Sequence, residues 1–256
     1  MKNPNVLIIL LCFIILGACT EEPSNSTVET SSLQLSFTSN FDGEPIIIDE
    51  STYLYDGNPI RFSKVSFYLS DLTLGGKEIT DVNFIDLTST HTSQQAAEEG
   101  TVLNFSKIPV GDYNTLALAI GVPADLNRTK PNEYSTSHPL GSDNSGEYWE
   151  AWNSYIFVKI EGQYDGDNNG FDADDVAFAY HVGQDEFYKK LSAEFDSAIS
   201  LKADESTNIE LRLDVEKLFV TDNGDLLELE AHDPSNQAEE MRIIMDNFRT
   251  ALVYRF

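Results

Sequence analysis

Short stretches of alternating apolar and polar residues recur through most of the chain. In each of them the apolar side chains occupy every second position, which is typical of a β-strand with one buried face. Clusters of Gly, Pro, Asn and Asp separate the stretches, as the turns of an antiparallel sheet require. The stretches lie at 33–37, 65–74, 116–122, 156–160, 176–182 and 209–215.

Helical periodicity is clear only near the C-terminus. Apolar residues recur at helical spacing over 239–250, and a shorter helix is expected around 216–219. The chain shows neither an internal repeat nor a second linker. We therefore predict an all-β fold, an antiparallel β-sandwich forming a single domain over 33–256, with a short C-terminal helical addition.

The first residues have the pattern of a lipoprotein signal. Lys2 precedes an apolar run that ends in LGAC at Cys19 and is shorter than a typical transmembrane helix. We expect residues 1–18 to be a lipoprotein signal peptide and Cys19 to carry the lipid. Residues 19–32, rich in Ser, Thr and Glu, would then be a flexible tether. This predicts a lipid-anchored protein of the cell envelope, at the outer membrane; the alternative is an uncleaved membrane anchor.

The composition restricts the partners and the metal ligands. Lys and Arg number 16 against 43 Asp and Glu, and the net charge of -27 repels nucleic acid. Of the two cysteines, Cys12 lies in the predicted signal peptide and Cys19 would be lipidated. Any metal site must therefore use nitrogen, oxygen or thioether ligands.

An acidic segment, DGDNNGFDADD at 165–175, begins like a calcium-binding loop. Oxygen-bearing side chains alternate and a glycine follows, so that several oxygens can surround one hard cation. The closing glutamate of an EF-hand and its flanking helices are missing, which favours a structural calcium ion over a sensor. The other interpretation is a solvated acidic turn. The predicted ligands are Asp165, Asp167 and Asn169, completed by Asp172, Asp174 or Asp175.

The chain has four histidines, of which His181 has the most informative surroundings. In the predicted strand 176–182, alternation places Ala177, Ala179 and His181 on the face opposite the larger apolar residues. The alanines leave room beside the imidazole for a bulky side chain from a neighbouring strand.

Both tryptophans of the chain, Trp149 and Trp152, lie just before the predicted strand 156–160. Trp152 has the same parity as the apolar residues of that strand, so it is expected where the apolar face begins. Taken alone, the residues favour two large aromatic side chains that close one end of the sandwich.

Five segments, in order along the chain, resemble the MbnP-like copper-binding domain family. Together they span nearly the whole of the predicted domain. The segments are 66–71 (SFYLSD), 110–113 (VGDY), 138–140 (HPL), 149–162 (WEAWNSYIFVKIEG) and 178–183 (FAYHVG).

This resemblance implies a function in copper binding. Members are exported or lipid-anchored β-proteins, often found with a dihaem cytochrome peroxidase partner, and the partner can oxidise a tryptophan to kynurenine. The kynurenine carbonyl and amine then help histidines to bind copper. Here the resemblance implies His181 as the first imidazole ligand, His138 as the second, and Trp149 or Trp152 as the oxidised residue. Trp152 is favoured because its context, WNSY, is closer to the family motif.

Two functions from different classes follow. The first is a copper-binding lipoprotein, which is not an enzyme but the substrate of a redox enzyme. The second is a calcium-stabilised module that binds a glycan or a protein at the cell envelope. A hydrolase with paired carboxylates is disfavoured, because no nucleophile motif supports it. If copper binds, His181 should lie near a tryptophan and a second histidine.

Overall fold

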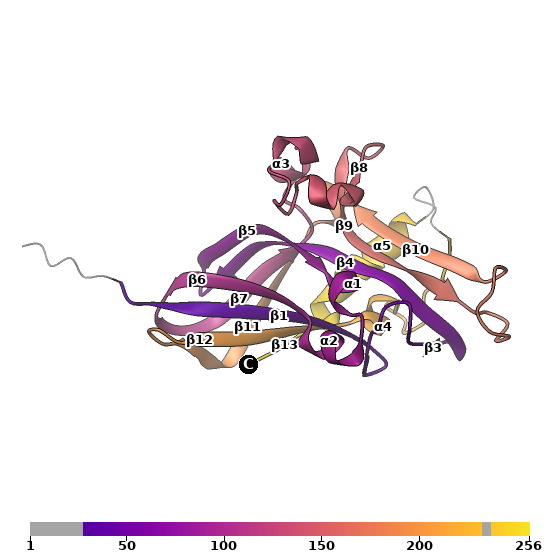
Figure 1. Cartoon of the computed structure of the whole chain (residues 1–256), viewed down its shortest axis with the longest axis horizontal. Helices are drawn as coiled ribbons and strands as arrows, with labels where there is room; N and C mark the ends of the chain where they lie inside the picture. The colour runs from indigo at the N-terminus through magenta and orange to yellow at the C-terminus, as the bar shows by residue number, and fades with distance from the viewer. Residues whose placement is uncertain (1–27, 232–236) are drawn as a thin grey trace, which may run out of the picture.

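Two β-sheets pack face to face and enclose the main core (Figure 1). The computed structural model describes residues 28–231 and 237–256. The predicted signal peptide, Cys19, most of the tether and His232 lie outside the described residues. In the described ranges, no helix combines the length and the apolar composition needed to cross a membrane.

The smaller sheet is built around the N-terminal strand β1. Its order is β13-β12-β1-β2, and β6 also pairs with β1. The pairing of β1 with β12 is parallel, whereas the other pairs of this sheet are antiparallel. The strands are β1 (Thr30–Phe41), β2 (Glu44–Pro45), β6 (Thr101–Pro109), β12 (Ser206–Asp214) and β13 (Leu252–Arg255).

The larger sheet is antiparallel and has the order β10-β9-β4-β7-β11, with β3 and β5 paired to β4 and β8 paired to β9. Its strands are β3 (Tyr53–Tyr55), β4 (Asn58–Leu74), β5 (Lys77–Asp86), β7 (Gly111–Ile120), β8 (Tyr148–Trp149), β9 (Ser154–Tyr164), β10 (Val176–Gly183) and β11 (Lys189–Leu201). These two sheets confirm the predicted all-β sandwich.

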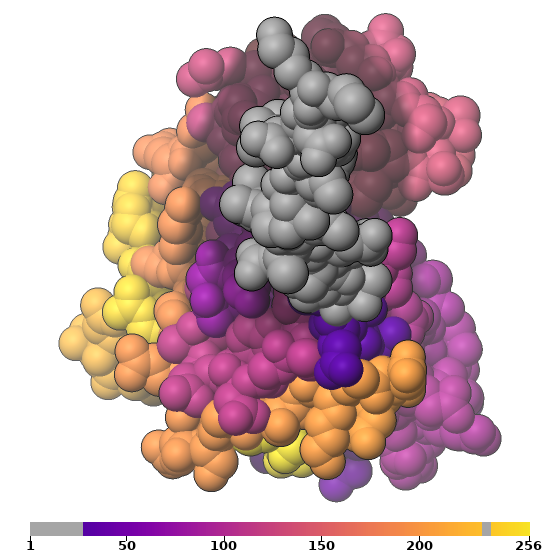
Figure 2. Space-filling view, turned by 90° about the vertical axis from the view of Figure 1, so that its left-hand side faces the viewer, coloured from indigo at the N-terminus to yellow at the C-terminus, as the bar shows by residue number. Residues whose placement is uncertain are grey.

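The long strand β4 changes its partner halfway along. Its first half pairs with β9 and its second half with β7, and the chain connects these two partners through the excursion 121–153. This excursion stands above the sandwich in both views (Figures 1 and 2). It covers a second, smaller core, which consists of Tyr68, Val82, Val122, Leu140, Tyr155 and Phe157.

Short helices occupy the connections, and one longer helix completes the main core. α5 buries five side chains, among them Phe248, whose ring lies 5.8 Å from that of Phe67. The predicted C-terminal helix is thereby confirmed. The helices are α1 (Leu87–Thr90), α2 (Gln94–Glu99), α3 (Ala124–Asn127), α4 (Val215–Leu218) and α5 (Ala238–Ala251), with 3-10 turns η1 (Pro131–Glu133), η2 (Ser142–Glu147) and η3 (Asp185–Phe187).

Candidate metal site on the outer face of the larger sheet

His181 lies on the outer face of β10. Phe178, Tyr180 and Val182 point into the main core, so the alternation of the strand turns His181 to the opposite side, as predicted. Its imidazole is partly buried, with 15% of the side chain exposed, and its Nε2 lies 2.6 Å from Oε1 of Glu161 on the neighbouring strand β9. The imidazole is therefore held against the sheet by a carboxylate.

The two tryptophans are stacked next to this imidazole. Their ring centroids are 4.6 Å apart with an interplanar angle of 24°. The Trp149 ring meets His181 in an edge-to-face arrangement, at 6.0 Å and 69°. Stacked and edge-to-face contacts are the favourable geometries for aromatic rings. The structure thus brings three of the four predicted copper-site residues together.

A tight turn between β8 and β9 places the tryptophans in this way. The backbone N–H of Trp152 donates to the carbonyl of Trp149 at 3.1 Å, and Asn153 has a φ of 50°, which Asn adopts more readily than most residues. Trp152 therefore lies in the turn and packs against the main core, and the ring of Trp149 contacts His181. The sequence favoured Trp152 as the oxidised residue, and this choice stays a prediction.

Gly183, at the end of β10, makes room for the tryptophan pair. A Cβ atom at this position would lie 3.0 Å from two ring carbons of Trp152 and 2.8 Å from the carbonyl oxygen of Tyr155. These distances are shorter than ordinary van der Waals contacts, so a side chain here would displace the indole. Sequence analysis did not single out this glycine.

Buried charges attach residues 146–152, here called the tryptophan segment, to the sheet. The Glu147 side chain is 7% exposed, and its carboxylate lies 2.9 Å from the ammonium of Lys159 and 3.6 Å from that of Lys64. Lys159 also donates to the carbonyl of Gly146 at 2.9 Å. Because Lys159 is the cross-strand neighbour of His181, this contact fixes the segment beside the imidazole.

The interaction with His181 changes the acidity of Glu161. The hydrogen bond from the imidazole lowers the pKa of this carboxyl group below its ordinary value, although burial acts in the opposite direction. Lys159 and Lys64 also lower this pKa through their positive charges. Glu161 is thus an ionised acceptor at neutral pH.

His138 takes part in a different set of contacts. Its ring stacks on Tyr134 at 4.3 Å and 12°, and its Nδ1 accepts the backbone N–H of Leu140 at 3.1 Å. These residues belong to the excursion that covers the smaller core. The structure does not bring His138 to His181, so the expected proximity of a second histidine is not met by this residue.

His91 is a structural histidine of the core. It is fully buried, its Nε2 accepts the backbone N–H of Ser39 at 3.1 Å, and its Nδ1 lies 3.1 Å from the Thr90 hydroxyl. Burial lowers the pKa of His91 to about 4. A neutral imidazole therefore ties the end of α1 to β1.

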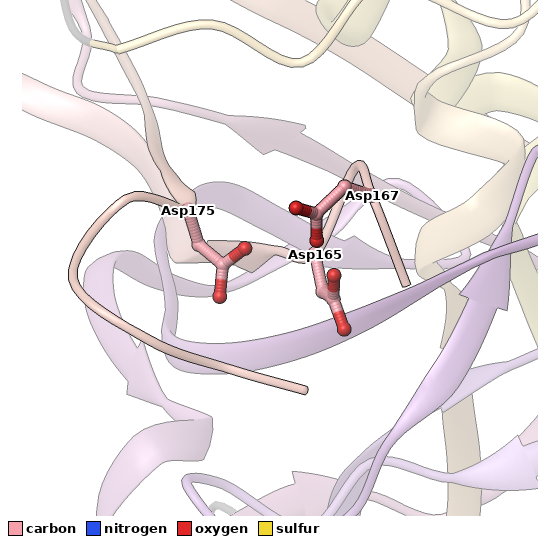
Figure 3. Close-up of side chains that lie close together, drawn as sticks. All are labelled: Asp165, Asp167 and Asp175. Atoms are coloured by element: carbon pink, nitrogen blue, oxygen red, sulfur yellow. The ribbon is translucent and has the colours of Figure 1, made fainter. Parts of the chain in front are cut away.

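The acidic loop connects the far ends of β9 and β10. Carboxylate oxygens of Asp165, Asp167 and Asp175 lie within 4.8 Å of one another, and Figure 3 shows the three groups around a common space. Asp165 is buried and accepts the backbone N–H groups of Asn169, at 3.2 Å, and Gly170, at 2.8 Å. The Asp165 carboxylate therefore holds the first turn of the loop through its backbone N–H groups.

The other three predicted calcium ligands make contacts within the loop. The Asn169 side-chain amide donates to Asp167 at 2.9 Å. Asp172 accepts the backbone N–H of Asp174 at 2.8 Å and donates its own N–H to Asp175 at 2.6 Å. Asp172 and Asp174 are exposed. Three of the six predicted ligands are thus gathered as carboxylates.

Comparison with known proteins agrees with this architecture. A structural match, at a TM-score of 0.52 and 15% sequence identity, covers 81% of this chain and 82% of MbnP from Methylosinus trichosporium. At this identity the match shows a similar fold. A search of the curated proteins found no match. The family model MbnP matches residues 30–242, and the chain therefore belongs to the MbnP family.

Proposed function

We propose that this protein binds copper on the outer face of β10, through His181 and an oxidised tryptophan. The observation that carries the proposal is the ring of Trp149, 6.0 Å from His181 and stacked at 4.6 Å on Trp152. Both tryptophans of the chain thus gather at one outward-facing imidazole.

The available donors fit copper if one tryptophan is oxidised. Imidazole suits copper in both oxidation states, and Cys19 is assigned to the lipid. An intact indole offers only its N–H donor, so it is a poor ligand. Met241 and Met245 are buried in the main core, on α5. Oxidation of a tryptophan to kynurenine would supply the missing carbonyl and amine.

This oxidation requires a partner. The indole opens at its C2–C3 bond, two oxygen atoms are added, and hydrolysis removes C2 as formate. A peroxide-using dihaem cytochrome, the partner type implied by the family, would supply the oxidising equivalents. The candidates for oxidation are Trp149, whose ring lies 6.0 Å from that of His181, and Trp152, which is stacked on it. The protein is then the substrate of an enzyme and not itself an enzyme.

Peptide mapping and copper titration test this function. In protein purified from its native host, one tryptophan should have lost one carbon and gained one oxygen. His181→Ala should lose most of its copper affinity, whereas His138→Ala, the matched control, should bind like the parent. Two unmodified tryptophans together with parental copper binding by His181→Ala would refute the proposal.

The location at the outer membrane rests on the lipidation of Cys19, which lies outside the described residues. Cys19→Ser should release the protein from the membrane fraction or leave it unprocessed. Normal processing together with membrane retention of this variant would contradict a lipid anchor.

A calcium-stabilised binding module is the second candidate. The three gathered carboxylates of the acidic loop support the ion. A surface pocket of about 270 Å³ beside Trp152, lined by polar residues such as Asn127, Arg128 and Asp185, would suit a polar ligand such as a glycan. Binding of glycans by the parent, with no copper bound, would favour this function.

A further inference from the structure

We propose that Glu161 is a positioning residue for copper binding, which fixes the tautomer of His181 and thereby selects Nδ1 as the nitrogen that binds the metal. This inference rests on the proposed function. It assigns a role to a carboxylate that does not need to touch the metal.

The hydrogen bond between the two side chains decides which imidazole nitrogen carries the hydrogen. Nε2 of His181 lies 2.6 Å from Oε1 of Glu161. An ionised carboxylate can only accept hydrogen bonds, so Nε2 carries the hydrogen. A neutral imidazole has one N–H group, and its lone pair is then on Nδ1. Carboxylates that hold histidine ligands in this way orient the ring and make it a stronger donor.

The sheet keeps Glu161 in place. β9 pairs with β4 on one side and β10 on the other, so the backbone of Glu161 is fixed by two neighbouring strands. Its cross-strand neighbour on β10 is Ala179, and its neighbour on β4 is Lys64. The small alanine leaves space for the carboxylate to reach His181, two residues further along β10. A site on rigid strands can hold this geometry closely.

A direct bond from Glu161 to copper is the alternative role. Carboxylates favour hard cations, whereas copper in its reduced state favours soft ligands. The hydrogen bond to Nε2 of His181 already engages Oε1 of the carboxylate. These two points favour positioning over ligation.

The tautomer can be measured without copper. Long-range proton–nitrogen NMR spectra of ¹⁵N-labelled, metal-free protein at about pH 8, where an ordinary histidine is neutral, should show the Nε2–H tautomer for His181. Glu161→Ala should show a mixture of tautomers. The control is Glu150→Ala, because Glu150 directly follows Trp149 in the chain and 73% of its side chain is exposed. An Nδ1–H tautomer of His181 in the parent would overturn the inference. An unchanged His181 tautomer in Glu161→Ala would also overturn it.

Copper affinity separates this inference from the proposed function. On protein from the native host, Glu161→Ala should weaken copper binding about 10–100-fold, the usual effect of losing such a partner. Glu161→Gln should be intermediate, because its amide oxygen still accepts a hydrogen bond. If His181→Ala loses copper and Glu161→Ala binds like the parent, only the positioning role fails. If both Glu161 variants lose copper as completely as His181→Ala, Glu161 is a direct ligand and positioning is wrong.

Discussion

The β9–β10 hairpin carries two different groups of candidate ligands. An imidazole and two indoles lie beside its open end, and carboxylates lie in the loop that connects its strands. His181 pairs with Lys159, six positions before Asp165. At about 3.3 Å per residue, the two groups are about 20 Å apart along β9. One hairpin thus presents nitrogen-based chemistry and hard oxygen ligands at separate places.

Different kinds of contact position the side chains of each group. In the acidic loop, Asp165 accepts backbone N–H groups from residues four and five positions further along the chain. Around His181, the contacts come from Glu161 of β9 and from Trp149 of β8. Local contacts follow from a motif, whereas contacts between strands depend on the register of the sheet.

The largest effect should come from removing the buried anchor of the tryptophan segment. Glu147→Ala leaves Lys159, whose side chain is 11% exposed, without its carboxylate. Breaking such a pair costs about 3–5 kcal/mol in the free energy of unfolding. Urea denaturation should show this loss, and the near-ultraviolet circular dichroism of the indoles should change. Glu150→Ala, at an exposed position, is the control; equal stability of the two variants would contradict the anchor.

Calcium should act on the opposite end of the hairpin. At a hundredfold excess over its dissociation constant, an ion bound only by the folded protein adds about 2.7 kcal/mol to its stability. Calcium should stabilise more than magnesium, because flexible carboxylates suit the larger ion. The double variant Asp167→Ala/Asn169→Ala should melt lower than the parent only when calcium is present. An equal difference in chelator would show that these residues cap a turn and bind no ion.

Crowding at Gly183 should disturb the indole pair with a smaller loss of stability. Gly183→Val forces a side chain against the Trp152 ring, 3.0 Å from a Cβ atom at this position. Such overpacking costs about 1–3 kcal/mol, and Trp fluorescence should report the displaced rings. The control is Gly146→Ala, since a Cβ atom there meets nothing within 4 Å. Parental fluorescence in Gly183→Val would mean that the ring does not depend on this glycine.

The sequence predicted those parts of the fold in which one face is regularly buried. β10 and α5 are examples, since their periodicity matches their burial. β6 and β11 were not predicted. Most apolar side chains of β6 are only partly buried. In β11, the register shifts between Glu194 and Ile199. The parallel pairing of β1 with β12 joins distant segments, and no local pattern reports it.

For the candidate site, the sequence predicted side chains but not their partners. The alternation of β10 correctly turned His181 outward, and the motif predicted the acidic loop. The positions of Glu161 and Gly183 follow from the pairing of β9 with β10, which the sequence does not specify. The turn at Asn153 likewise sets the positions of the stacked pair Trp149 and Trp152 beside the imidazole. Sequence spacing alone cannot give these contacts.

The smallest expected effect is the pH dependence of the Glu161–His181 pair. The pKa of Glu161 in the folded protein is lowered from its ordinary value of 4.5. Its unfolded form therefore binds protons first as the pH falls, and the stability from this pair is present above pH 4.5 and is lost as the pH falls through the lowered pKa. With 35% of the Glu161 side chain exposed, the contribution should stay below about 1 kcal/mol. Urea denaturation of the parent and Glu161→Gln from neutral to acidic pH should show two curves that converge in acid. A difference that grows as the pH falls would show that Glu161 is not stabilised as a carboxylate by His181.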